Sequence, residues 1–168
     1  MDFQIIEKEA FRIIGKGIRV TMKNGGNFRR IPQFWSECEK NGLFDKLAGL
    51  SDGEEMFGVC TDFDPQQQEF TYMIAMRKKA GMPDVPDNEL TEKEIPAFTW
   101  AVFEAAGPLP HAIQQVWKKI FSEWLPVSGY EHADGPQLEV YPPGDPDASG
   151  YVSEVWIPVV RKQTAGKE

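Results

Sequence analysis

Residues 95–124 read IPAFTWAVFEAAGPLPHAIQQVWKKIFSEW and join an apolar segment to an amphipathic one. The segment from Ile95 to Gly107 is almost wholly apolar and predicts a strand. In the segment that follows, apolar residues recur every three or four positions and predict one face of a helix: Ile113, Trp117, Ile120 and Trp124. A closing hairpin is predicted next, around a turn rich in Pro, Gly and Asp. Its two strands are PQLEVYPP (residues 136–143) and YVSEVWIPVVRK (residues 151–162).

The first half of the chain shows the same order of elements. Residues 3–21, FQIIEKEAFRIIGKGIRVT, alternate apolar and polar and predict one strand, kinked at Gly15 or Gly17. Residues 28–49 have helical apolar spacing and predict a helix interrupted near Asn41 and Gly42. A hairpin is predicted next, with the strands EMFGVCTDF and EFTYMIAMRK on either side of DPQQQ. The segment that follows, AGMPDVPDNELTEKE, is rich in proline and acidic residues and predicts a connection between the halves.

A constant offset relates the two halves. Trp35 and Trp117 occupy matching positions in the predicted helices, 82 residues apart, and Val59 and Val140 in matching strands are 81 apart. This offset predicts an internal repeat. A unit of three strands and one helix is too small to be stable alone, so we expect both units to share a sheet and a core.

The predicted fold is therefore α+β, built from tandem duplicated βαββ units with pseudo-two-fold symmetry. An antiparallel sheet would carry two main helices that flank a central cleft, and the seam between repeats favours a small-molecule site. The expected boundaries are a single domain over residues 1–168, with one repeat at about 3–80 and the other at about 90–162.

Composition narrows the classes of function. The 168 residues include 18 Lys and Arg against 26 Asp and Glu, a formal net charge of −8, which disfavours direct nucleic-acid binding. No apolar run is long enough for a membrane span, and MDFQIIEKEAF lacks the pattern of a signal peptide. Cys38 and Cys60 are expected to be free and buried. We therefore expect a cytoplasmic protein without metal or cofactor, and a monomer or weak dimer.

Glu154 is unusual because it interrupts the apolar strand YVSEVWIPVV. Strand alternation places it on the same face as Trp156. It either pairs with Arg161, Lys162 or a residue of a neighbouring strand at a wet surface, or remains unpaired in an aromatic cleft, since an isolated buried carboxylate is costly. In the cleft it would attract a lipophilic cation or serve as a general base. Tyr141 is expected to lie near it across the hairpin, and Glu139 shares the face of Tyr141, so two acids on one side of the hairpin would raise the pKa of one of them.

The residues just quoted resemble the effector-binding domain of the GyrI-like family. IPAFTWAVFEAAGPLPHAIQQVWKKIFSEW followed by LEVYPP and YVSEVWIPV carries the more specific part of the resemblance, and IPQFWSECEKNG with EMFGVCTDFD matches the first repeat. The resemblance covers about residues 3–162. The GyrI-like family includes the drug-sensing domains of certain MerR- and AraC-type regulators and a gyrase-inhibitory protein.

The resemblance implies a ligand cleft at the seam of the repeats, with the acid of EVWIPV, Glu154, facing the ligand. Matching positions assign Trp100, Trp117 and Tyr141 to the aromatic walls, and Trp156 joins them through the face that it shares with Glu154. The function expected is multidrug binding: a stand-alone protein that senses or sequesters lipophilic, cationic aromatic compounds, with a possible link to transcription regulation through a regulatory protein partner.

Two alternatives follow from the same resemblance. Some stand-alone members resemble hydrolases of cyclopropane-bearing toxic compounds, and Glu154 with Tyr141 would carry that chemistry here. Membership also allows a protein-interaction module such as a gyrase modulator, although no sequence feature marks an interface. We expect binding rather than catalysis, and if the protein is an enzyme we expect a hydrolase.

Overall fold

A computed structural model describes residues 2–85 and 87–163. The helical elements are a short 3-10 turn η1, three α-helices and a π-helical turn η2 that continues α3: η1 (Lys23–Gly25), α1 (Gly26–Lys40), α2 (Leu43–Ala48), α3 (His111–Lys119) and η2 (Ile120–Trp124). The strands are β1 (Phe3–Lys8), β2 (Phe11–Thr21), β3 (Ser51–Asp64), β4 (Glu69–Lys78), β5 (Thr91–Ile95), β6 (Phe98–Ala106), β7 (Tyr130–His132), β8 (Gln137–Tyr141) and β9 (Val152–Arg161).

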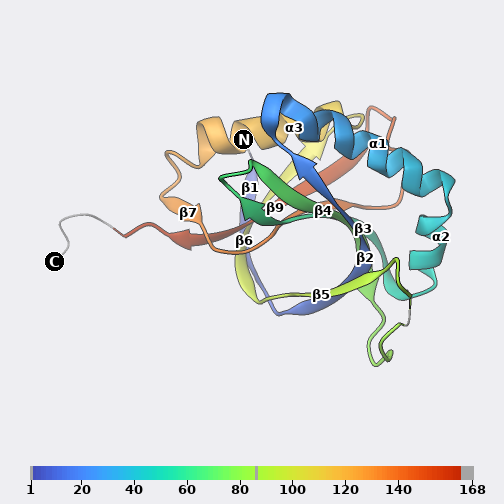
Figure 1. The fold of residues 1–168 in the computed structure, drawn as a ribbon. Helices are drawn as coiled ribbons and strands as arrows, with labels where there is room; N and C mark the ends of the chain where they lie inside the picture. Colours follow the sequence, from blue (N-terminus) through green and yellow to red (C-terminus); the bar gives the residue numbers. More distant parts are fainter. Residues whose placement is uncertain (1, 86, 164–168) are drawn as a thin grey trace.

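The strands form one antiparallel sheet, which confirms the predicted α+β class. Their order is β1-β6-β9-β8-β3-β4-β2-β5, and β7 pairs separately with β9. The sheet curls until its ends lie together (Figure 1). Lys8 pairs with Phe98 on β1 and β6, and Phe11 pairs in the same register with Ile95 on β2 and β5. The β1–β6 and β2–β5 pairs therefore form one interrupted ladder, which joins the two ends of the sheet.

Two sequence predictions about the strands were wrong. The predicted strand over residues 3–21 breaks at Glu9 and Ala10, not at a glycine. Gly15 lies within β2, and its lack of a side chain permits close packing of strands. A Cβ at this position would lie 2.0 Å from the Ile74 carbonyl oxygen. The predicted connection before residue 95 also contains β5, in which Glu94 is exposed, Glu92 and Lys93 are half-buried and Ile95 is buried.

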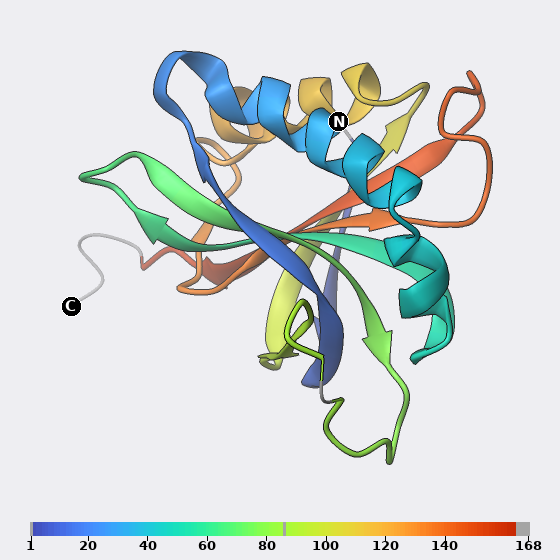
Figure 2. The same ribbon diagram turned by 45° about the vertical axis from the view of Figure 1, so that its right-hand side comes forward.

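Helices α1 and α3 lie side by side over one face of the sheet, as the two views agree (Figures 1 and 2). The opposite face lies inside the curl and is filled by a buried cluster around Trp100, Leu138 and Trp156. Separate clusters lie beneath α1 with α2 and beneath α3. The predicted interruption at Asn41 and Gly42 is confirmed, since α1 ends at Lys40 and α2 begins at Leu43.

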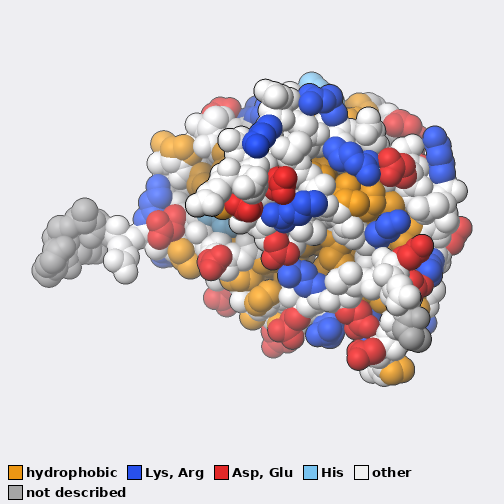
Figure 3. All heavy atoms as spheres, viewed as in Figure 1, with side chains coloured by type: hydrophobic (Ala, Val, Ile, Leu, Met, Phe, Trp, Pro, Cys, Tyr) orange, Lys and Arg blue, Asp and Glu red, His pale blue; other side chains and the backbone are white. Residues whose placement is uncertain are grey.

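The surface carries charges of both signs. Acidic and basic side chains are interspersed over the face seen in Figure 3. Within residues 2–85 and 87–163, no helix has the length and apolar character that crossing a membrane requires.

Candidate functional site

A cavity of about 1050 Å³ lies between α1 and α3 above the middle of the sheet. Its walls are largely aromatic because both helices direct ring side chains inward, and its floor is formed by β3 and β8. The rings that matter for the site are Phe28, Trp35, Phe44, Trp117, Phe121 and Tyr141. A space of this size suits a multi-ring organic molecule, since drug-sized sites range over roughly 300–1,000 Å³.

Glu139 is the carboxylate on the cavity floor. Its side chain is buried, at 5% exposure, and accepts hydrogen bonds from both sides. The hydroxyls of Tyr72 and Tyr141 donate to Oε1 at 2.6 and 2.9 Å. Trp117 Nε1 donates to Oε2 at 2.8 Å, and Trp35 Nε1 donates to the Tyr72 hydroxyl at 2.8 Å. The carboxylate is thus linked to both helices.

Strand alternation explains why this acid faces the helices. On β8, Leu138 and Val140 point into the curl and belong to its buried cluster. Gln137, Glu139 and Tyr141 therefore point to the opposite face and line the cavity. Gly58 lies directly across from Glu139 on β3, where the absence of a side chain leaves room for the carboxylate and the Tyr72 hydroxyl.

Burial and hydrogen bonding act on the Glu139 carboxyl in opposite directions. Burial raises its pKa above the ordinary value of 4.5, and the donors Tyr72, Trp117 and Tyr141 lower it without cancelling the rise. Burial also raises the pKa of both tyrosines well above 10.0, so both hydroxyls remain protonated donors. Neutral donors stabilise a carboxylate but leave its charge uncompensated.

Lys118 also lines the cavity, but its Nζ lies over the Phe28 ring, 5.7 Å from the ring centroid, and forms no ion pair with Glu139. The ion pairs within residues 2–85 and 87–163 do not include Glu139. The same residues contain no group of three or more His, Cys, Asp or Glu side chains placed to hold a metal ion. The arrangement can therefore accept a positively charged organic group, or move a proton between Glu139 and a bound molecule.

The structure brings together only part of the predicted site. Trp117 and Tyr141 line the cavity, as expected. Glu154, Trp156 and Trp100 do not: they lie on the opposite face of the sheet, where Trp100 and Trp156 are core residues and Trp156 Nε1 donates to Glu154 Oε1 at 3.0 Å. The prediction that Glu154 is the cleft carboxylate is therefore corrected, because Glu139 takes that position.

The pairing register of the closing hairpin explains the correction. Glu154 lies directly opposite Val140, so both point into the curl, whereas Tyr141 and Glu139 point to the cavity. A shift of one residue in register would exchange the two faces. The alternative in which Glu154 pairs with Arg161 or Lys162 is not realised either, since the ion pairs of the described residues do not include it.

Comparison with known proteins gives the family. The model of the GyrI-like small molecule binding domain matches residues 1–160. The chain belongs to the GyrI-like family. This confirms the resemblance found in the sequence, and no curated protein sequence matches the chain significantly.

Several solved structures share the fold of this GyrI-like domain. SAV2435 bound to tetraphenylphosphonium is 22% identical, with a TM-score of 0.82 over 95% of this chain and 94% of that one. A putative bacterial transcription regulation protein from Staphylococcus aureus MU50 is 23% identical, with a TM-score of 0.74 over 95% and 98%. EcmrR in its DNA complex is 15% identical, with a TM-score of 0.65 over 96% of this chain and 58% of that one. At these identities the likeness shows the fold.

Sequence reasoning missed three residues of the GyrI-like cavity: Tyr72, Trp35 as a hydrogen-bond donor, and Glu139 as the central acid. The repeat offset contained a usable signal for the last. If Val59 matches Val140, then Glu139 matches Gly58, and both positions lie next to a buried valine. An acid at one position and a glycine at its counterpart would indicate a residue that the fold itself does not require.

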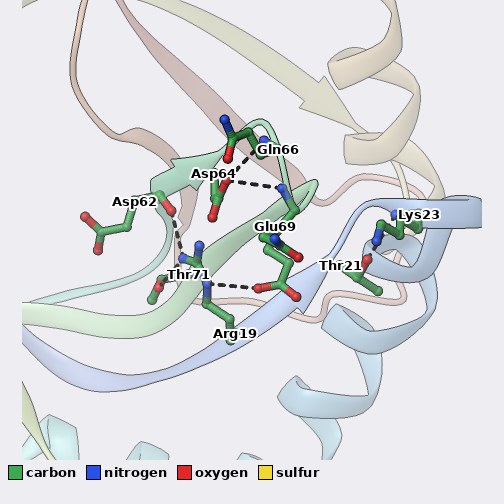
Figure 4. A network of polar contacts seen from close by, with 9 residues as sticks. Arg19, Thr21, Lys23, Asp62, Asp64, Gln66, Glu69 and Thr71 are labelled. Carbon is green, nitrogen blue, oxygen red and sulfur yellow. Dashed lines mark hydrogen bonds and ion pairs between the residues drawn. The ribbon is translucent and has the colours of Figure 1, made fainter.

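An exposed polar network links β2 to the β3–β4 hairpin (Figure 4). The Arg19 guanidinium donates to the Asp62 carbonyl at 2.7 Å and to Thr71 Oγ1 at 3.0 Å, and it also pairs with Glu69. Asp64 accepts from two backbone N–H groups of the turn between β3 and β4. This hairpin carries cavity residues Phe63 and Phe70, whose rings stack at 5.1 Å, and the network holds them against β2.

Proposed function

We propose that this GyrI-like protein binds lipophilic, cationic aromatic molecules in the cavity between α1 and α3, with Glu139 as the charge anchor. One observation carries the proposal: among the described residues, the donors to the buried Glu139 carboxylate are the neutral groups of Tyr72, Tyr141 and Trp117. The tetraphenylphosphonium complex of SAV2435, which has the same fold, supports this class of ligand.

The physical basis is a match between a weakly hydrated cation and a buried carboxylate. A cation whose charge is spread over several rings loses little hydration on entering the cavity. At about 5 Å from a carboxylate, with an effective dielectric constant near 20, it gains about 3 kcal/mol. The faces of Trp35 and Trp117 add roughly 0.5–2 kcal/mol each where the cation lies over them. A neutral molecule of the same shape gains none of the charge term.

The cleft between related halves also belongs to this proposal. We infer that the domain is a duplicated βαββ unit, because the strand order of the sheet is symmetric. If β1 corresponds to β5, β2 to β6, β3 to β8 and β4 to β9, the order read from one edge matches the order read from the other edge. Trp35 and Trp117 then stand at matching helix positions on both sides of one acid. Sensing or sequestration of the ligand would use this cleft, and a regulatory protein partner remains a prediction.

Hydrolysis is a second candidate, favoured by one contact. The Tyr141 hydroxyl donates to Glu139 Oε1 at 2.9 Å, and both groups line the cavity, so an acid and a base of the kind needed to open a strained ring lie together. In this version Glu139 takes a proton from a water molecule, whose oxygen forms a bond to one ring carbon while the C–C bond to the next carbon breaks. Tyr141 protonates the carbon that leaves and regains a proton from Glu139. Tyr141→Phe would then abolish turnover of an activated cyclopropane compound while leaving cation binding within about threefold.

The binding proposal is tested by calorimetric titration with tetraphenylphosphonium and with neutral triphenylphosphine oxide. We expect Glu139→Gln to weaken the cation by about 100-fold, in line with the Coulomb gain of about 3 kcal/mol, and the neutral compound by less than about threefold. Glu154→Gln is the matched control, since it removes a carboxylate from the other face of the same sheet, and it should leave both affinities unchanged. Equal losses for both compounds in Glu139→Gln would contradict the charge anchor.

A further inference from the structure

Gln137 is a second polar side chain on the floor of the cavity. It precedes Glu139 by two residues on β8, so both point to the same face, about 7 Å apart along the strand. Its side chain is buried, at 9% exposure, and lines the cavity. The residues of β8 that face the cavity are Gln137, Glu139 and Tyr141, since Leu138 and Val140 point into the curl.

His132 fixes the orientation of the Gln137 amide. His132 Nδ1 lies within hydrogen-bond distance of the Ala133 carbonyl, and a carbonyl only accepts, so Nδ1 is the donor of that bond. Gln137 Nε2 lies 2.9 Å from His132 Nε2. An amide nitrogen only donates, so His132 Nε2 accepts this bond. The amide nitrogen is therefore directed toward His132, which leaves Oε1 as the atom without a hydrogen-bond partner among the described residues.

We propose that Gln137 Oε1 is a hydrogen-bond acceptor for the ligand, so that the site prefers aromatic cations bearing N–H groups over fully alkylated or arylated onium ions. The inference rests on the proposed function, since it assumes that cations enter the cavity. A ligand anchored at Glu139 extends along β8 over Gln137. An N–H at a distance of about 7 Å from the centre of positive charge meets a fixed acceptor there.

The selectivity comes from the free-energy cost of leaving a hydrogen-bonding group in the cavity without a partner. An N–H donor that leaves water for this cavity loses its water hydrogen bonds, and Gln137 Oε1 replaces one. A dimethylamino group in the same place offers no donor and covers the amide oxygen, which then loses its own contact with water. Charge does not distinguish the two ligands, so the selectivity belongs to Gln137 and not to Glu139.

Two rhodamine dyes of equal charge and similar frame test the inference. Rhodamine 123 carries terminal N–H groups, and tetramethylrhodamine methyl ester carries dimethylamino groups in their place. Both affinities are measured by fluorescence anisotropy in wild type and Gln137→Met. We expect the variant to lose about tenfold in affinity for rhodamine 123, equivalent to about 1.4 kcal/mol, and less than twofold for the tetramethyl dye. Gln114→Met is the matched control, because Gln114 lines the same cavity from α3.

The outcomes separate this inference from the proposed function. Binding of both dyes with equal losses in Gln137→Met, or a larger loss of rhodamine 123 in Gln114→Met, would overturn the role of Gln137 and leave the cation site intact. Failure of both dyes to bind wild type would overturn the proposed function as well. If Gln137→Met does not fold, Gln137→Asn withdraws the amide by one methylene and should show the same selective loss.

Discussion

Gly58 is predicted to be required for the site because the hydrogen bond between Tyr72 and Glu139 occupies the space of its missing side chain. A Cβ at this position would lie 2.1 Å from the Tyr72 hydroxyl oxygen, 2.5 Å from Glu139 Oε1 and 2.8 Å from Tyr72 Cζ. None of these distances is tolerable, so Gly58→Ala must move the tyrosine, the carboxylate or the strand. The neighbours are buried, which leaves little room for such a movement.

The magnitude follows from two costs and one gain. Loss of a hydrogen bond to a carboxylate costs about 1.5–3 kcal/mol, and overpacking costs about 1–3 kcal/mol. The entropic gain of replacing a strand glycine offsets about 0.5–1 kcal/mol. We therefore expect Gly58→Ala to lower the free energy of unfolding by about 3 kcal/mol, and to lower the urea midpoint by roughly 1–2 M at typical slopes.

Urea unfolding followed by tryptophan fluorescence measures this change, and Gly17→Ala is its control. Gly17 is also a strand glycine, but an added Cβ would approach nothing closer than Thr71 Cγ2 at 3.3 Å, so its cost should stay below about 1 kcal/mol. Adding Tyr72→Phe to Gly58→Ala removes the nearest clash and should restore part of the loss. Equal stabilities of the two alanine variants would mean that Gly58 is not required for the contact between Tyr72 and Glu139.

Two further predictions concern Glu139. Because burial raises the pKa of Glu139 above 4.5 in the folded protein, the folded state binds more protons than the unfolded state in the pH interval above 4.5. Wild type should therefore lose stability relative to Glu139→Gln as the pH rises through that interval, while its affinity for tetraphenylphosphonium rises. Parallel curves of stability against pH for the two proteins would contradict this. Trp117→Phe removes a donor to Glu139 and should shift the pH midpoint of cation binding upward, whereas Trp156→Phe, whose indole donates to Glu154, should not move it.

The elements of the fold were predictable because their signals are local. Apolar spacing of 3.6 residues identified α1 and α3, and alternation with a short turn identified the β3–β4 hairpin. Strand β5 was missed because its sequence, TEKEI, buries mainly one apolar side chain, Ile95, and follows a segment rich in proline and acid. Its place depends on pairing with β2, which is distant in sequence.

The cavity was only half predictable, for a reason of register. Alternation correctly grouped Glu139 with Tyr141 and Glu154 with Trp156, but it does not say which pair faces the helices. That depends on how β8 and β9 pair across a long connection, where turn geometry does not fix the register. Once Val140 lies opposite Glu154, Glu139 becomes the cavity acid.

The position of a bound cation in a crystal would show whether Glu139 is the charge anchor. Tetraphenylarsonium has the shape and charge of tetraphenylphosphonium, and its arsenic atom can be located by anomalous diffraction in crystals of the complex. We expect one anomalous peak inside the cavity, between Trp35 and Trp117, at about 5 Å from the Glu139 carboxylate, the distance used for the Coulomb estimate. A peak beside Glu154 on the other face of the sheet, or a cavity without a peak at saturating ligand, would contradict it.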